Sequence, residues 1–99
     1  GETPGERRER ALCPSPYLGY DRDGIAMHLL TCEAYDLAES QLRLATRLNP
    51  YEPRFKAHLA WCLFKKGLYE EASVLLAKIP ERERDDHIRA IARAVARGS

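Results

Sequence analysis

The sequence contains few cysteines, and their arrangement excludes a disulfide framework. The three are Cys13, Cys32 and Cys62. An odd number at wide spacing fits a reducing compartment. The histidines are equally scattered, at His28, His58 and His87. With no Cys-x-x-Cys pair and no four-ligand cluster, the pattern predicts no metal site. Cys32 and Cys62 fall within predicted helices, where a thiol behaves as a small buried apolar group.

A long apolar run is also missing. The longest runs, such as Val74–Ala77, are far shorter than the roughly 18 residues that a membrane span requires. The arginine-rich segment 1–10 lacks the apolar centre of a secretory signal. These absences predict a cytoplasmic protein that does not associate with a membrane.

The chain has no large excess of charge of one sign. It carries 16 basic and 15 acidic side chains, a formal net charge of +1, whereas nucleic-acid-binding domains usually show a clear basic excess. A basic stripe does occur at a spacing of four along the last predicted helix, formed by Arg89, Arg93 and Arg97. Together with Arg7, Arg8 and Arg10 of the N-terminal arm, this stripe supports nucleic-acid binding as an alternative hypothesis. A solvated helix face near the negative end of the helix dipole is the favoured interpretation.

Catalytic motifs are absent as well. The sequence has no Gly-rich phosphate loop, no Gly-x-Ser-x-Gly and no His-Glu-x-x-His. The acidic pairs Glu70–Glu71 and Asp85–Asp86 are adjacent in sequence, so their side chains point in different directions on a helix. We therefore predict that the protein is not an enzyme and uses no cofactor.

What the sequence does contain is helical periodicity, and the predicted fold class is all-α. Three prolines and three glycines indicate a flexible or extended arm over residues 1–21, followed by a helical domain over 22–97. Apolar residues at helical spacing predict helices after Asp23, from Asp36 to about Leu48, from Pro53 to about Lys66, from Tyr69 to Lys78, and from Asp85 to Arg97. No segment shows the sustained alternation of a half-buried strand.

The chain also repeats itself at an offset of 34 residues. Large and small residues recur together in seven pairs: Ile25 and Leu59, Ala26 and Ala60, Leu29 and Leu63, Tyr35 and Tyr69, Ala38 and Ala72, Leu42 and Leu76, and Ala45 and Ile79. Small residues recur where two helices must approach closely, and larger ones where apolar faces fill the seam. The repeat therefore predicts two copies of one helical hairpin that share a core.

These residues resemble the tetratricopeptide repeat family, whose units are helix–turn–helix pairs of about 34 residues. The resemblance implies a short right-handed solenoid, with repeat 1 at about 19–52, repeat 2 at about 53–84 and a capping helix at about 85–97. Three departures from the pattern stand out. Arg22 and Lys56 replace the early Trp of each unit, Glu33 replaces the turn glycine of the first unit, and Pro80 ends the second unit early.

The resemblance also implies a protein-binding site. In this family the first helix of each pair lines a concave groove that receives a peptide or a partner helix. Carried over to this chain, the positions form an apolar strip with basic side chains at its margin: Tyr20, Met27, Leu30, Arg54, Trp61, Phe64 and Lys65. Trp and Arg are frequent anchors of protein interfaces. We predict an interaction module, a scaffold or adaptor, whose partner is another protein or peptide.

Two alternatives concern the same surfaces. Trp61 and Phe64 could instead fill the core against the arm or the last helix, as aromatic residues at helical spacing often do. Self-association into a homodimer would cover the exposed ends of a two-unit solenoid. The clamp for a terminal carboxylate used by some chaperone-binding members is not expected. Met27 and Trp61 stand where Asn would be needed, and Asp23 adds a negative charge.

Overall fold

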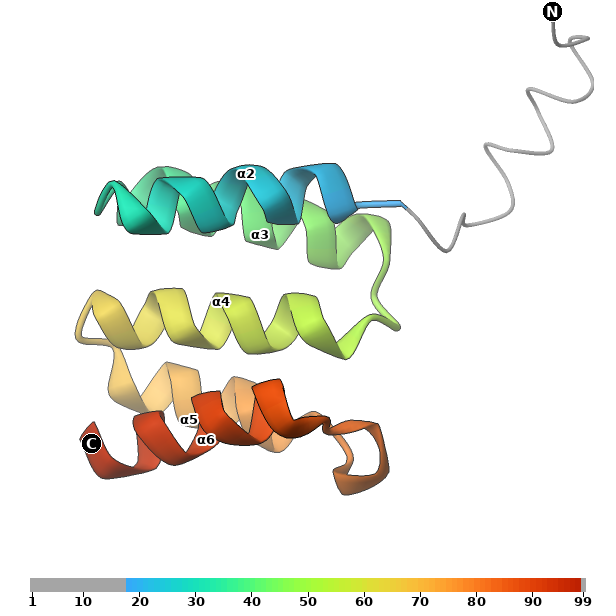
Figure 1. Cartoon of the computed structure of the whole chain (residues 1–99), viewed down its shortest axis with the longest axis vertical. Coiled ribbons are helices and arrows are strands. Elements are labelled where there is room, and N and C mark those ends of the chain that lie inside the picture. The colour runs from blue at the N-terminus through green and yellow to red at the C-terminus, as the bar shows by residue number, and fades with distance from the viewer. Residues whose placement is uncertain (1–17, 99) are drawn as a thin grey trace, which may run out of the picture.

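The computed structural model describes residues 18–98 of the chain, and this part is all-α, as predicted (Figure 1). The helices are α2 Tyr20–Thr31, α3 Tyr35–Leu48, α4 Pro53–Lys65, α5 Tyr69–Ala77, the short 3₁₀ helix η1 Glu81–Glu83, and α6 Asp86–Gly98. No β-strand occurs within 18–98. Most of the predicted arm, residues 1–17, lies outside the described part of the chain.

The helices form two hairpins and one further helix. α2 packs antiparallel on α3, and α4 packs antiparallel on α5 (Figure 1). The hairpins touch through α3 and α4, and α6 packs on both α4 and α5. Among the helices of residues 18–98, α4 therefore contacts every other α-helix. The prediction that segments 24–48 and 54–78 are helical hairpins in contact is confirmed.

The repeated alanines are fully buried in the core. Ala26 and Ala60 on the first helices, and Ala38 and Ala72 on the second, all have no exposed surface. A methyl side chain is the smallest that still fills such a seam, so a larger residue would force the helices apart. The 34-residue repeat therefore identified the contact positions of both hairpins.

α2 begins earlier than the apolar periodicity predicts. Its first residue is Tyr20, so Tyr20 and Asp21 belong to the helix rather than to the predicted arm, and the N-cap is Gly19. Neither Asp21 nor Asp23 caps the helix; both lie in its first turn, where the positive end of the helix dipole favours acidic residues. Gly19 has a left-handed backbone with φ of 93° and is buried.

The turn that ends the first helix of each hairpin has the same geometry in both repeats. Gly67 has φ of 85°, and the Leu68 amide donates to the Leu63 carbonyl at 2.9 Å. In the first repeat, Glu33 has φ of 60°, and the Ala34 amide donates to the Leu29 carbonyl at 2.9 Å. Glu33 thus adopts the left-handed conformation that glycine usually supplies at this position.

Replacing Glu33 with glycine should stabilise the protein. A side chain in the left-handed region costs about 1–2 kcal/mol, and glycine would remove this strain. Glycine also makes the unfolded chain more flexible, which offsets part of the stabilisation. We expect Glu33→Gly to raise the free energy of unfolding by about 1 kcal/mol and Tm by roughly 4–8 °C, measured by thermal circular dichroism. The opposite substitution at the equivalent turn of the second repeat, Gly67→Ala, should lower Tm. An unchanged or lower Tm for Glu33→Gly would contradict the turn geometry.

The connection from α5 to α6 is held by two side chains. Arg84 donates from Nη2 to the Leu76 carbonyl at 2.7 Å and from Nε to the Ile79 carbonyl at 3.1 Å. These carbonyls lie at the end of α5 and just beyond it, where helical partners run out; the Leu76 carbonyl also accepts the Ile79 amide at 3.0 Å. Asp85 caps α6 by accepting the Ile88 amide at 2.8 Å, and this hydrogen bond lowers the pKa of the carboxyl. The cap directs the apolar face of α6 into the core.

Candidate functional site

A cavity of about 310 Å³ lies between α2, α4 and α6. It is lined by Met27 from α2, by His58 and Trp61 from α4, and by His87, Ala90, Ile91 and Ala94 from α6. Two of the seven predicted groove residues, Met27 and Trp61, therefore meet at one site. The lining is largely apolar apart from the two histidines, a composition typical of pockets that accept apolar groups.

Three polar side chains form a hydrogen-bonded chain that reaches this cavity through His58 and His87. His58 and Asp23 are 6% and 7% exposed, and His58 Nδ1 lies 2.6 Å from Asp23 Oδ1. On its other side, His58 Nε2 lies 2.8 Å from His87 Nε2. Asp23 lies on α2, His58 on α4 and His87 on α6. These hydrogen bonds therefore link the first helices of both hairpins to the last helix.

With Asp23 ionised and both histidines neutral, one placement of the protons satisfies both hydrogen bonds. An ionised carboxylate only accepts, so His58 donates its Nδ1–H to Asp23. In neutral His58 the Nε2 atom is then an acceptor, and His87 donates its Nε2–H to it. Every buried polar side-chain atom in residues 18–98 has a partner. The arrangement resembles a proton relay, but the residues that line the cavity include no serine, cysteine or threonine nucleophile.

The predicted basic and aromatic residues at the far end of α4 adjoin the cavity through Trp61. The Lys65 ammonium lies 4.8 Å from the Trp61 ring centre, a cation–π contact. Trp61 and Phe64 have ring centres 5.4 Å apart, and Phe64 lies at the same distance from Tyr69. The end of α6 at Gly98 approaches the Phe64 ring closely. Phe64 is thus half-buried against the last helix, while Trp61 remains at the cavity.

The other three predicted groove residues lie apart from the cavity. Tyr20 donates its hydroxyl to Glu52 at 2.7 Å, which raises the pKa of Tyr20, and its ring packs edge-on against Phe55. Arg54 is exposed in the first turn of α4. Leu30 is partly buried against the core. The structure therefore brings Met27, Trp61, Phe64 and Lys65 into one region, and it places Tyr20, Arg54 and Leu30 elsewhere.

Sequence reasoning missed the polar chain because it treated each histidine alone. Asp23 and His58 are 35 residues apart, one repeat length plus one. In a 34-residue repeat that spacing puts two residues on neighbouring first helices at nearly the same height. An acidic residue and a histidine at this spacing could therefore have predicted the contact between Asp23 and His58. His87 could not have been placed without the path of the α5–α6 connection.

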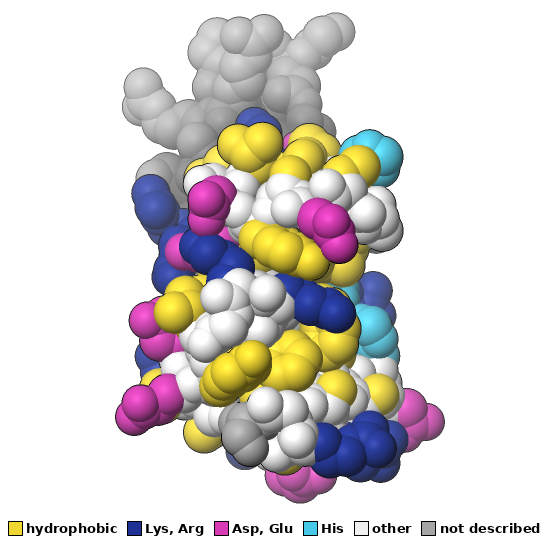
Figure 2. All heavy atoms as spheres, turned by 90° about the vertical axis from the view of Figure 1, so that its left-hand side faces the viewer, with side chains coloured by type: hydrophobic (Ala, Val, Ile, Leu, Met, Phe, Trp, Pro, Cys, Tyr) yellow, Lys and Arg dark blue, Asp and Glu magenta, His cyan; other side chains and the backbone are white. Residues whose placement is uncertain are grey.

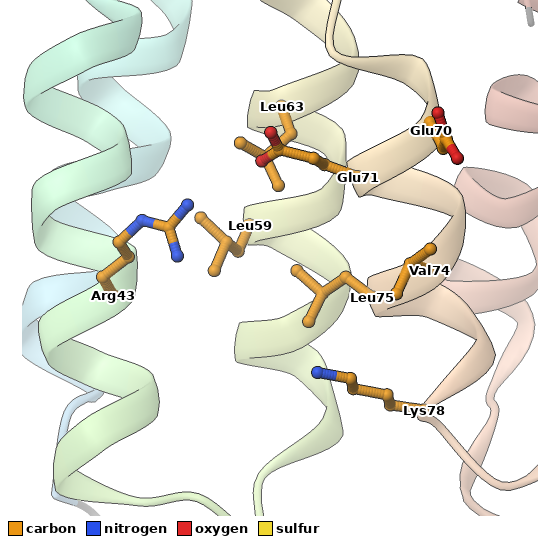
Figure 3. A pocket seen from close by; sticks show the side chains of 8 residues that line it. All are labelled: Arg43, Leu59, Leu63, Glu70, Glu71, Val74, Leu75 and Lys78. Atoms are coloured by element: carbon orange, nitrogen blue, oxygen red, sulfur yellow. The ribbon is translucent and has the colours of Figure 1, made fainter.

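A second groove lies on another side of the molecule, between α3 and α5 (Figure 3). Its volume is about 390 Å³, and Leu59 and Leu63 of α4 form its floor with Leu75 of α5. Arg43 and Lys78 point into the gap from opposite sides (Figure 3). Hydrophobic side chains are also exposed on the face at which the interhelical turns lie (Figure 2). The exposed ones near these turns include Leu37, Leu68 and Tyr69.

The two described cysteines differ in environment. Cys62 is buried, as predicted, and its Sγ lies 3.3 Å from the Tyr35 carbonyl. The prediction for Cys32 is wrong: it is exposed, because α2 ends at Thr31 and Cys32 is its C-cap. Sequence periodicity placed the cysteine inside the helix and could not locate the last turn.

Cys62 should resist alkylation in the folded protein. Burial raises the pKa of its thiol from 9.0 to about 11, so the reactive thiolate is scarce at neutral pH. With iodoacetamide we expect Cys32 to be labelled first and Cys62 only after denaturation, as followed by peptide mass spectrometry. Because the native pKa is raised, this thiol contributes stability that is present below pH 9.0 and is lost as the pH rises towards about 11. Equal labelling rates would contradict its burial.

Two further properties concern only residues 18–98. None of their helices combines the length and apolarity needed to cross a bilayer. Within the same range, no cluster of three or more His, Cys, Asp and Glu side chains has an arrangement that could hold a metal ion.

The comparisons with known proteins agree with the helical repeat. A sequence model of the tetratricopeptide repeat family matches residues 29–97, which is more than two-thirds of the chain and includes α6. No curated protein and no solved structure matches the chain. Because the match covers most of the chain and coincides with the repeated hairpins, the chain belongs to the tetratricopeptide repeat family.

Proposed function

We propose that the chain is an interaction module that binds a peptide or a partner helix of another protein along α2, α4 and α6. Proteins of this family are generally protein–protein interaction modules. We further infer that the hairpins and α6 stack as a short right-handed solenoid with these three helices on its concave side. The observation that carries the proposal is the cavity in which Met27 and Trp61 converge.

The residues that line the cavity indicate which side chains of a partner would fit it. An apolar side chain of the partner would enter between Met27, Trp61 and Ile91 and displace water from apolar walls. Trp61 is half-buried, so it presents a ring face while its position is fixed by Phe64 and Lys65. Rigid aromatic anchors of this kind contribute much of the affinity at protein interfaces. Lys65 at one margin favours an acidic residue beside the apolar anchor.

The test is to block the cavity without removing any core side chain. Ala90 is an exposed residue of α6 that lines the cavity, so Ala90→Arg fills the opening at little cost to folding. Ser73→Arg on the exposed face of α5 is the matched control. Partners captured by the wild type and by Ser73→Arg, but not by Ala90→Arg, support groove binding. Capture of the same partners by all three folded proteins would refute it.

Self-association is a second candidate, favoured by the groove between α3 and α5. Glu70 and Glu71 line one part of it and Lys78 another, and Figure 3 shows Lys78 at the opposite end from the two acids. None of these three has an ion-pair partner in residues 18–98. A two-fold axis through the apolar floor would place the acids of one copy against the lysine of the other. Sedimentation equilibrium tests this, since Val74→Lys in the groove should shift a dimer to monomer.

The nucleic-acid alternative is weakened by the ion pairs of α6. Arg89 lies 3.5 Å from Glu81 and 3.4 Å from Asp86, so one arginine of the stripe already has acidic partners. Binding a phosphate backbone there would break these pairs and would need more positive charge than remains. We infer that the arginine row is a solvated face. A gel shift at low salt would overturn this inference.

A further inference from the structure

We propose that His58 and His87 form a binding site for a divalent late first-row metal ion such as Zn²⁺ or Ni²⁺, coordinated by their Nε2 atoms. The two Nε2 atoms point at each other across 2.8 Å at the wall of the cavity. Imidazole nitrogen is a preferred ligand of these ions. The site needs no third protein ligand, because the cavity leaves space for water to complete the coordination.

Asp23 supplies the support that a metal-binding histidine needs. Ligating histidines usually donate their other ring N–H to a carboxylate, which fixes the tautomer and makes the free nitrogen more basic. His58 makes this bond from Nδ1 to Asp23 at 2.6 Å, and both residues are buried. Its Nε2 lone pair is therefore held in one direction, towards His87. This hydrogen bond from His58 to Asp23 is present without any metal.

Metal binding requires the His87 ring to turn. Metal–nitrogen bonds of about 2.0–2.1 Å at a tetrahedral angle place two nitrogens about 3.3 Å apart, whereas the two Nε2 atoms face each other at 2.8 Å between ring centres that are 5.1 Å apart. His87 is exposed and lies in the first turn of α6, so its ring can move without disturbing the core. Binding replaces the shared hydrogen bond, and the proton of neutral His87 moves from Nε2 to Nδ1 by exchange with water, so that Nε2 can coordinate the metal.

Charge also favours a cation at this position. Asp23 is a buried carboxylate whose hydrogen-bond partner is an imidazole, and a buried negative charge is costly unless it is compensated. A metal ion on His58 Nε2 would provide that compensation through the ring. The thioether of Met27 lines the same cavity and offers a further soft ligand.

The test must distinguish metal binding at His58 and His87 from binding at a second pair of side chains on the surface. Cys32 Sγ lies 3.8 Å from His28 Nε2 one turn earlier, and both side chains are exposed. The experiment is calorimetric titration of Zn²⁺ and Ni²⁺ at neutral pH into the full chain, His87→Ala and His28→Ala, with folding of each checked by circular dichroism. We expect one equivalent to bind the wild type and His28→Ala equally. His87→Ala should lose at least tenfold in affinity.

Further measurements keep the proposal falsifiable. Asp23→Asn should weaken binding by about 10–100-fold, as loss of a carboxylate that orients a metal-binding histidine usually does. Nitrogen-15 histidine spectra should show Zn²⁺ shifting the Nε2 atoms of residues 58 and 87. Three results would each overturn the site: no binding at millimolar metal, equal affinity of His87→Ala and the wild type, or loss of binding only in His28→Ala. The groove-blocking variant Ala90→Arg tests partner binding separately, so failure of one proposal is distinguishable from failure of the other.

Discussion

Phe55→Ala should lower the free energy of unfolding by about 3–5 kcal/mol, the usual cost of deleting a buried aromatic side chain. Phe55 has no exposed surface and is the largest fully buried side chain in residues 18–98. Its ring packs edge-on against Tyr20, with ring centres 5.0 Å apart, and lies beneath Gly19. Truncation would leave a cavity where the start of α2 meets α4.

Urea denaturation followed by circular dichroism measures this loss. Domains of this size are usually only about 5–15 kcal/mol stable, so the variant should lie near its unfolding threshold. Phe64→Ala is the matched control, because Phe64 is only half-buried and its removal leaves a more open site. A smaller loss for Phe55→Ala than for Phe64→Ala would show that Phe55 does not occupy the core position described.

Gly19→Ala is the second substitution expected to have a large effect, about 2–4 kcal/mol of destabilisation from two additive causes. The residue has φ of 93°, which an alanine adopts only with strain. A Cβ atom at this position would also lie 2.8 Å from Phe55 Cε2 and 3.1 Å from the Ala45 carbonyl oxygen. The oxygen belongs to the backbone of α3, so it cannot move aside cheaply.

Gly24 provides the matched control for this substitution. It lies inside α2, and a Cβ there would meet no atom within 4 Å. Gly24→Ala should therefore stabilise the protein by about 1 kcal/mol through helix propensity. Thermal unfolding should show Tm moving in opposite directions for the two variants. A stabilising effect of Gly19→Ala would contradict the left-handed start of α2.

Much of the fold could be predicted because the repeat encodes packing directly. Ala26 and Ala38 recur one repeat later, and all four positions are buried as a spacing of 34 implies. The exact helix ends could not be predicted in the same way, because they depend on backbone conformations. Glu33 adopts a left-handed conformation only because the surrounding turn requires it, and nothing in its chemistry indicates that.

The candidate site was predictable only in part. Met27 and Trp61 converge because repeat register specifies which face of each first helix looks inward. The last helix does not keep that register: the pattern of Leu59 and Leu63 recurs 32 residues later, at Ile91 and Val95. The shorter spacing follows the early end of α5. The contact between His58 and His87 therefore depends on the α5–α6 connection, whose length does not follow the 34-residue repeat.

The central place of α4 has a consequence for how the molecule opens. Since α4 touches the four other α-helices of the described part of the chain, its amide hydrogens should exchange with solvent only when the whole domain unfolds. α2 packs mainly on α3 and α4, so it can detach in a smaller, more frequent fluctuation. Each such event would carry Asp23 away from His58 while leaving His58 and His87 together. The imidazole pair would then face water transiently without its carboxylate.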